Sequence, residues 1–192
     1  MNRYSALVIG TSAGGLNALT RIIPALNKGF PVPIIIVQHM SPEGSNFTSS
    51  YLDTISSLNV REGDEKEMLE PGTVYLAAPN YHLLIDRNKT LSLSVDAKVN
   101  YSRPSIDVLF ESAAEVYREK LLALVLTGAN SDGTKGALKV IEFGGSVLVQ
   151  DPETAEAAAM PLSVIEHCQV EAILPLDEIA DYLNTKIYEK EN

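Results

Sequence analysis

Short, unbroken apolar runs alternate along the chain with longer segments in which apolar residues recur at helical spacing. The apolar runs cover residues 6–9, 34–37, 74–77, 121–127, 146–150 and 172–174. The helical pattern covers residues 16–23, 47–58, 104–117, 133–143 and 176–188. Continuous apolar strands between amphipathic helices are typical of a parallel sheet with both faces covered. The pattern therefore predicts an α/β fold with a doubly wound, mostly parallel sheet and helices on both faces.

Two further features complete the expected architecture. Residues 82–86 and 90–95 flank the polar turn Arg87-Asn88-Lys89, which predicts a small antiparallel hairpin. No repeat, linker or low-complexity segment interrupts the chain, and 192 residues suffice to bury one full core. We therefore expect residues 1–192 to form a single domain.

Composition narrows the setting and the partners. The longest apolar run falls short of the roughly 18 residues that a membrane span needs, and the first strand begins too early for a signal peptide. The single cysteine, Cys168, has no partner within the chain, which favours a reducing compartment. A net charge of −10 disfavours nucleic acid and anionic membrane surfaces as partners. We expect a cytoplasmic protein that neither binds nucleic acid nor inserts into a membrane.

The most informative motif is Gly10-Thr11-Ser12-Ala13-Gly14, directly after the first apolar run. Glycines on both sides of a serine at a strand-to-helix turn are the pattern of a nucleophile elbow, which exposes the hydroxyl at the strand's carboxyl end. The first N–H groups of the following helix would point toward the serine, where a developing oxyanion needs donors. The motif predicts Ser12 as a nucleophile.

A glycine-rich turn after the first strand can instead hold a phosphate or a dinucleotide. The spacing here is G-x-x-x-G-G, not G-x-G-x-x-G, and no Gly-Lys-Ser/Thr follows. The second strand ends in Gln38-His39 and offers no acidic residue for a ribose hydroxyl. These differences favour the nucleophile and predict no cofactor.

Catalytic groups in such a sheet gather outside the carboxyl ends of the strands, near the point where strand order reverses. His39 follows the second strand, whereas His82 begins a hairpin strand and His167 ends a late helix. Position therefore favours His39 as the base that a serine nucleophile requires. No second ligand lies at a usable spacing from it, so we expect no metal site.

The carboxylate that would orient His39 is less well determined. Asp132 follows the strand at 121–127 and also precedes a helix, where it could serve as an N-cap. Asp151 follows a strand too and is a credible rival. Asp107 lies in the first turn of a helix, where a negative charge suits the macrodipole. Position alone does not decide whether Asp132 or Asp151 orients His39.

Several separated motifs resemble the catalytic domain of the chemotaxis protein-glutamate methylesterases, the CheB family, over nearly the whole chain. The matching stretches are Val8-Ile9-Gly10-Thr11-Ser12-Ala13-Gly14-Gly15, Val37-Gln38-His39-Met40, Tyr75-Leu76-Ala77-Ala78-Pro79-Asn80-Tyr81-His82-Leu83, Arg103-Pro104-Ser105-Ile106-Asp107-Val108-Leu109-Phe110, Leu126-Thr127-Gly128-Ala129-Asn130-Ser131-Asp132-Gly133, Gln150-Asp151 and Met160-Pro161. The resemblance implies Ser12 as nucleophile, His39 as base and Asp132 as its orienting carboxylate, and it favours Asp132 over Asp151.

The resemblance also implies an activity and a partner. The reaction would be hydrolysis of glutamate γ-methyl esters on the cytoplasmic helices of methyl-accepting chemoreceptors, with release of methanol, and deamidation of receptor glutamines in some relatives. Main-chain N–H groups of Ala13 and Ala129 would meet the oxyanion. Arg103 and Met160 become candidates for the substrate region, although Arg103 could equally serve packing.

Two departures from the family pattern stand out. Many members carry threonine at the position of Ala13 and Gly-Met-Gly at Gly128-Ala129-Asn130, although backbone donors survive both changes. No phosphoacceptor domain precedes the first strand, so we expect a stand-alone esterase or a part of a longer protein, with any regulator a separate protein. A small serine esterase of another substrate range, or a non-catalytic signalling scaffold of the same fold, remain the alternatives.

Overall fold

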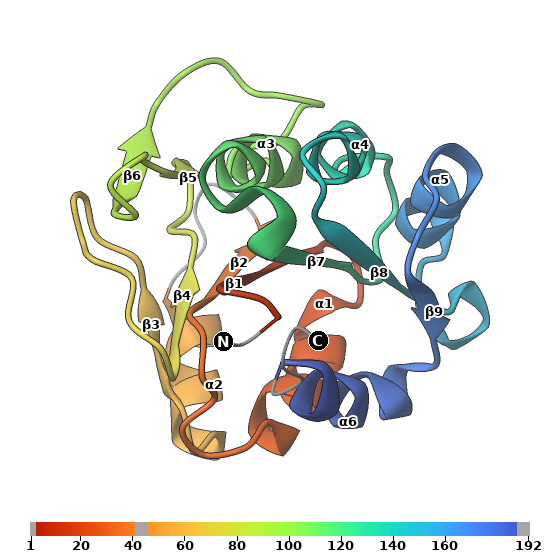
Figure 1. The fold of residues 1–192 in the computed structure, drawn as a ribbon, viewed down its shortest axis with the longest axis horizontal. Helices are drawn as coiled ribbons and strands as arrows, with labels where there is room; N and C mark the ends of the chain where they lie inside the picture. The colour runs from red at the N-terminus through yellow and green to blue at the C-terminus, as the bar shows by residue number, and fades with distance from the viewer. Residues whose placement is uncertain (1–2, 41–45, 188–192) are drawn as a thin grey trace.

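A seven-stranded sheet forms the centre of the protein, which a computed structural model describes over residues 3–40 and 46–187 (Figure 1). All of its strand pairs are parallel, and their order across the sheet is β3-β4-β2-β1-β7-β8-β9. The strands are β1 (Ala6–Thr11), β2 (Ile34–Gln38), β3 (Asn59–Glu62), β4 (Thr73–Leu76), β7 (Leu121–Val125), β8 (Ser146–Gln150) and β9 (Ala172–Leu174). The doubly wound α/β fold expected from the sequence is confirmed.

Helices cover both faces of the sheet (Figure 1). One face carries α1 (Gly15–Ile22), α2 (Phe47–Ile55) and α6 (Leu176–Lys186). The other carries α3 (Ile106–Tyr117), α4 (Thr134–Glu142) and α5 (Ala159–His167). Short 3-10 turns lie at Ile23–Ala25, Arg118–Lys120 and Pro152–Thr154. Both helical layers follow from strands that are apolar on both faces.

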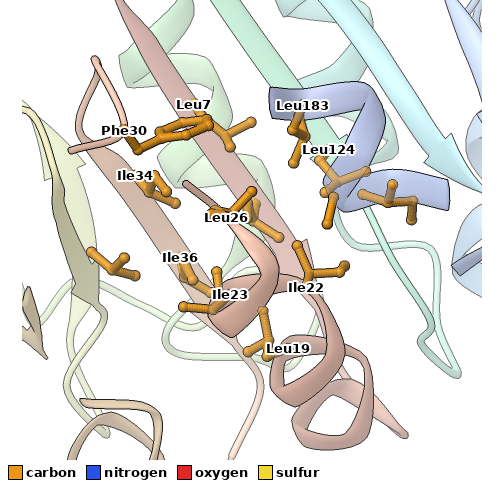
Figure 2. Close-up of a cluster of buried hydrophobic side chains, with 14 of the residues drawn as sticks. Leu7, Leu19, Ile22, Ile23, Leu26, Phe30, Ile34, Ile36, Leu124 and Leu183 are labelled. Carbon is orange, nitrogen blue, oxygen red and sulfur yellow. The ribbon is translucent and has the colours of Figure 1, made fainter. Parts of the chain in front are cut away.

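Alternate residues of each strand feed the two cores. Leu7 and Ile9 of β1 lie in the core under α1 and α6, whereas Ala6 and Val8 lie in the core under α3 and α4. Figure 2 shows the first of these cores, in which residues of the first two strands meet aliphatic side chains of α1, the following turn and α6. Burial of both faces of the central strands explains why each reads as an unbroken apolar run rather than an alternating one.

The expected hairpin is present as a separate two-stranded antiparallel sheet of β5 (His82–Ile85) and β6 (Leu91–Ser94). Its apolar side chains join the core on the α3 face, as Leu83 and Leu91 show. Strand β3 was not expected from the sequence. Its segment Asn-Val-Arg-Glu has one apolar residue because it lies at the edge of the sheet, and its local pattern therefore carries little strand signal.

The strand order reverses at the centre of the sheet, between β1 and β7. The chain leaves β1 through α1 on one face and enters β7 from α3 on the other. In open α/β sheets, ligands bind in the crevice outside the carboxyl ends of the strands at such a reversal. The Ser12 N–H donates to the Thr127 carbonyl at 2.9 Å and joins the two strand ends there. The topology therefore directs attention to the residues that follow β1, β2 and β7.

Helix α2 departs from the expectation that an apolar helical stripe faces the core. Phe47, Tyr51 and Ile55 are 59%, 42% and 36% exposed, whereas Thr48, Ser49 and Leu52 of the same helix are buried. Leu58 is buried, but it lies beyond the end of the helix. The helix packs on β3 and α1 with Thr48, Ser49 and Leu52 on its buried side, and its aromatic stripe faces solvent.

The crossing of α3 and α4 depends on Gly136. A Cβ at this position would lie 2.6 Å from Phe110 Cβ and 3.1 Å from Asp107 Cα. We expect Gly136→Ala to lower the free energy of unfolding by about 1–3 kcal/mol through overpacking, although alanine is favoured over glycine within a helix by about 1 kcal/mol. Urea denaturation measures this, with Lys135→Ala, at an exposed position of α4, as the control. A Gly136→Ala protein of unchanged or higher stability would contradict the close crossing.

Candidate active site

Ser12 directly follows β1 at the carboxyl edge of the sheet. Gly14, with φ of +78°, turns the chain into α1, and the Gly15 N–H donates to the Ser12 carbonyl at 2.9 Å. Positive φ is strained for residues with a Cβ, which is why glycine stands at this turn. The turn leaves Ser12 half-buried on the wall of an open cavity of about 490 Å³ that Gln38 and Tyr51 also line.

His39 is brought beside Ser12 by strand register. Thr11 and Gln38 are partners across β1 and β2, and each is followed at once by one of the two residues. The His39 N–H donates to the Thr11 carbonyl at 3.0 Å, which extends the pairing by one step. No hydrogen bond joins the Ser12 and His39 side chains in the described ranges. Catalytic hydrogen bonds are often long in proteins without substrate and tighten only in the complex.

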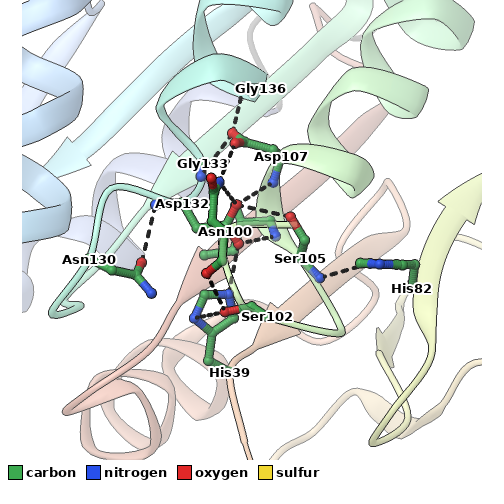
Figure 3. A network of polar contacts seen from close by, with 11 residues as sticks. His39, His82, Asn100, Ser102, Ser105, Asp107, Asn130, Asp132, Gly133 and Gly136 are labelled. Carbon is green, nitrogen blue, oxygen red and sulfur yellow. Dashed lines mark hydrogen bonds and ion pairs between the residues drawn. The ribbon is translucent and has the colours of Figure 1, made fainter. Parts of the chain in front are cut away.

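The His39 ring contacts Asp132 directly. Its Nε2 lies 2.7 Å from Asp132 Oδ2, and the Asp132 side chain is fully buried (Figure 3). His39 Nδ1 is thereby left for another partner, and the Ser102 hydroxyl lies 3.5 Å from it. In proteases of the trypsin type, the carboxylate holds Nδ1 and Nε2 faces the serine. Here the carboxylate is met by Nε2 instead, and Nδ1 is the nitrogen on the other side of the ring.

Asp132 is surrounded by hydrogen-bond donors. Besides His39, it accepts from the N–H groups of Ile106 and Asp107 and from the side chains of Asn100 and Ser105, at 2.7–3.3 Å. Burial raises the pKa of Asp132, but hydrogen bonds from His39, the Ile106 N–H and Asn100 outweigh it and hold the pKa at about 2. The carboxylate therefore stays charged next to His39.

Two aspartates cap each other's helices. Asp132 precedes α4, yet its oxygens accept from the first N–H groups of α3, so it is not the N-cap of its own helix that the sequence allowed. Asp107, in the first turn of α3, accepts from the N–H groups of Gly133 and Gly136 at the start of α4. Helix N-termini favour negative charge, and the exchange fixes α3 against α4.

Asn100 links the two carboxylates. Its Nδ2 donates to Asp107 Oδ2 at 2.9 Å and to Asp132 Oδ1 at 3.0 Å (Figure 3). Asn100 and Tyr101 have φ of +48° and +62° and form the tip of a two-residue turn, across which Val99 and Ser102 exchange backbone hydrogen bonds. This sign pattern is that of a type I′ turn, in which asparagine is favoured. An asparagine in such a turn is visible in the sequence, but nothing in the local pattern indicates that its amide group reaches both Asp107 and the distant Asp132.

The other expected site residues fall into two groups. Ala13 and Ala129 are exposed beside the ends of β1 and β7, and their N–H groups have no acceptor within the described part of the chain. Arg103 instead makes structural contacts. Its guanidinium donates to the Asn80 side chain and to the backbone carbonyls of Val95 and Asp96. Met160 is fully buried.

Met160 acts beneath the site rather than at its surface. A Cβ at Gly128 would lie 2.5 Å from Met160 Cε, and the Met160 N–H donates to the Gly128 carbonyl at 2.9 Å. This packing supports the loop that presents Ala129. Asp151, the rival carboxylate, accepts from the Glu153 N–H in its own 3-10 turn.

The remaining histidines have structural contacts. His82 is buried, with Nε2 3.1 Å from the Ala97 carbonyl and Nδ1 accepting from the Ser105 N–H, so it supports a donor of Asp132. His167 Nδ1 lies 2.7 Å from the Ser163 carbonyl near the end of α5. Sequence reasoning missed Asn100, Ser102 and Ser105, which approach His39 and Asp132 through a loop with no motif of its own beyond Arg103-Pro104-Ser105.

A doubly wound sheet with serine, histidine and aspartate gathered at its carboxyl edge is characteristic of serine hydrolases. The family model described as CheB methylesterase matches residues 7–183. The chain belongs to the CheB methylesterase family.

Individual relatives agree with this assignment. A Leptospira interrogans protein is 51% identical over 93% of this chain and 92% of its own length, and is provisionally named a protein-glutamate methylesterase/protein-glutamine glutaminase. A Thermotoga maritima protein with the same two activities in its name is 42% identical over 92% of this chain, which spans 52% of that protein. The crystal structure of the Thermotoga maritima CheB methylesterase catalytic domain superimposes with a TM-score of 0.91, at 41% identity, covering 94% of this chain and 97% of that one.

The buried Asp107 predicts a pH dependence of stability. Burial, with the nearby charge of Asp132, raises its pKa from 3.8 to about 6. Between these values the native state holds a proton that the unfolded state has lost, so the free energy of unfolding falls as pH rises. We expect Asp107→Asn to remove on the order of 2 kcal/mol of this fall. Urea denaturation at pH 4 and pH 7 measures it, and an equal pH dependence in both proteins would contradict it.

Proposed function

We propose that this chain hydrolyses γ-methyl esters of glutamate residues in the cytoplasmic part of chemoreceptors and releases methanol. The observation that carries the proposal is the position of Ser12, at the sheet reversal and beside a histidine whose Nε2 lies 2.7 Å from a fully buried carboxylate. Membership of the CheB methylesterase family and the names of the relatives support the substrate. No helix in the described ranges is long and apolar enough to span a membrane.

In the first half of the reaction, the Ser12 oxygen attacks the ester carbonyl carbon while His39 Nδ1 takes the hydroxyl proton. Nδ1 is the nitrogen available for this step because Nε2 faces Asp132. The charged Asp132 stabilises the imidazolium that forms. Collapse of the tetrahedral intermediate breaks the bond to the methoxy oxygen, which leaves as methanol with the proton from His39. The glutamyl group stays on Ser12 as an ester.

The negative oxygen of the intermediate needs donors that are already in place. The N–H groups of Ala13 and Ala129 suit this role, since both residues are exposed and follow Ser12 and Thr127 within two residues, and a backbone hydrogen bond joins Ser12 to Thr127. Removal of a single oxyanion donor costs about 2.7–4 kcal/mol of transition-state stabilisation in a well-studied serine protease. Because the donors are backbone groups, alanine serves at position 13 as well as threonine does.

In the second half, a water molecule attacks the glutamyl ester while His39 Nδ1 takes a proton from it. The bond to Ser12 breaks, and the serine oxygen recovers that proton. The product is a free glutamate carboxylate. The same cycle with ammonia in place of methanol deamidates a glutamine, and the glutaminase activity in the names of the relatives supports this as a second reaction of the site.

The catalytic assignment predicts the effect of three substitutions. We expect Ser12→Ala, His39→Gln and Asp132→Asn each to lower kcat on a small glutamate γ-methyl ester by about 10⁴-fold, because the three groups act as one unit. Methanol release measures turnover, and circular dichroism checks the fold. Turnover of that ester by the wild-type protein would distinguish an esterase from a non-catalytic scaffold. Turnover of methylated receptor would distinguish a methylesterase from an esterase with other substrates.

A covalent probe distinguishes the two hydroxyls near His39. Ser102 lies 3.5 Å from Nδ1, so it is the competitor to Ser12. We expect an alkyl fluorophosphonate to label the wild-type protein on Ser12, as located by peptide mass spectrometry, and not to label the Ser12→Ala protein. Labelling of Ser102 in wild type would overturn the assignment.

The link made by Asn100 predicts a positioning effect on catalysis. Glycine tolerates the positive φ of this position, so Asn100→Gly keeps the turn and removes the donor to Asp132. We expect kcat to fall about tenfold with little change in KM, the size of one hydrogen bond to a charged group. Tyr101→Gly relaxes the same turn without touching Asp132 and is the matched control. Equal losses in both variants would assign the effect to turn stiffness alone.

A further inference from the structure

An exposed apolar row on α2 borders the cavity of Ser12. The row consists of Phe47, Tyr51 and Ile55, which are spaced by four residues and therefore lie on one side of the helix. The rings of Phe47 and Tyr51 stack with centroids 5.7 Å apart and planes 3° apart. Apolar residues at this spacing normally face a core, and here the buried side of the helix is formed by Thr48, Ser49 and Leu52.

Among the described residues, those that neighbour the row on the same side of α2 carry no charge. The other exposed residues on this side are Ser50 and Thr54. Asp53 is the charged residue of α2, and its Oδ1 accepts the Val60 N–H at 2.9 Å. Aromatic residues together with depletion of charge mark the centre of protein interfaces.

The row is continuous with the candidate active site. Tyr51 lines the same cavity of about 490 Å³ as Ser12 and Gln38. A segment that places one side chain over Ser12 would therefore extend along the row. We infer that Phe47, Tyr51 and Ile55 form a docking surface for the helical segment that carries the substrate side chain. This inference rests on the proposed function, since the occupant is the substrate of the Ser12 site.

The dimensions favour a helical substrate over a second copy of this chain. Residues 47–55 span about 12 Å, or two helical turns, which matches a partner helix with apolar residues at i and i+4. Three partly exposed side chains fall far below the roughly 1,200 Å² that a stable interface buries. A contact of this size suits a partner that must dissociate after each turnover.

Charge also favours apolar docking. The chain carries a net charge of −10, and Glu156 lines the cavity with its Oε1 accepting from Asn17 at 2.7 Å. An acidic segment would be repelled at long range, and salt would screen this repulsion. Binding through the α2 row therefore predicts that added salt does not weaken the substrate contact.

The test compares two substrates in wild-type protein and in Ile55→Ser, because Ile55 does not line the Ser12 cavity. One substrate is a purified methylated chemoreceptor cytoplasmic fragment, and the other is N-acetylglutamate γ-methyl ester. We expect Ile55→Ser to lower the ratio of kcat/KM for the fragment to that for the small ester about tenfold, mainly through KM. Leu138→Ser, at a 44% exposed position of α4, is the matched control and should keep the wild-type ratio.

Each outcome separates the docking surface from the proposed function. An unchanged ratio in both Ile55→Ser and Tyr51→Ser/Ile55→Ser would overturn the docking surface while leaving the esterase intact. A wild-type protein that releases methanol from neither substrate would overturn the proposed function itself. A wild-type dimer in sedimentation that Ile55→Ser dissolves would reassign the row to contact between copies. A steep fall of kcat/KM for the fragment between 50 mM and 500 mM salt, roughly a threefold change in Debye length, would assign binding to charge instead.

Discussion

The buried charge of Asp132 is the constraint on which the rest of the site depends. A carboxylate with no exposure is costly unless donors surround it, and here His39, the start of α3 and the loop at Asn100 and Ser105 all turn toward it. The same donors keep it ionised, as its pKa of about 2 records. The hydrogen bonds to the Asp132 carboxylate thus fix the His39 ring, the first turn of α3 and the loop in one arrangement.

Asp107 extends this arrangement into the fold. Asp107 accepts hydrogen bonds from the first N–H groups of α4, just as Asp132 accepts them from the start of α3. Asn100 donates to both carboxylates. The close approach of the two helices at Gly136 brings these groups together. Burial, together with the nearby charge of Asp132, raises the pKa of Asp107, so the geometry that orders the site also makes the protein sensitive to pH.

The solvent-facing side of the site, toward α2, carries fewer charges than the buried cluster of Asp107 and Asp132. Ser12 opens to a cavity whose wall continues into the exposed row on α2, whereas Arg103 is occupied by backbone carbonyls and Asn80. The apolar row suits a neutral ester, and the Glu156 carboxylate at the cavity disfavours retention of the carboxylate product. The apolar row on α2 and the Ser12 cavity therefore both suit the same substrate, a neutral ester.

Local sequence determined the strands, the turn at Ser12 and the positions of His39 and Asp132 at one sheet edge, because unbroken apolar runs and glycine turns act through short-range sterics and burial. It did not determine β3, whose edge position removes the apolar signal, nor the outward face of α2. The helix that Asp132 caps, and the link through Asn100, were decided by the tertiary structure alone. The contacts with Asp132 join residues 25 or more positions apart, and a hydrogen bond across that distance leaves no periodicity in the chain.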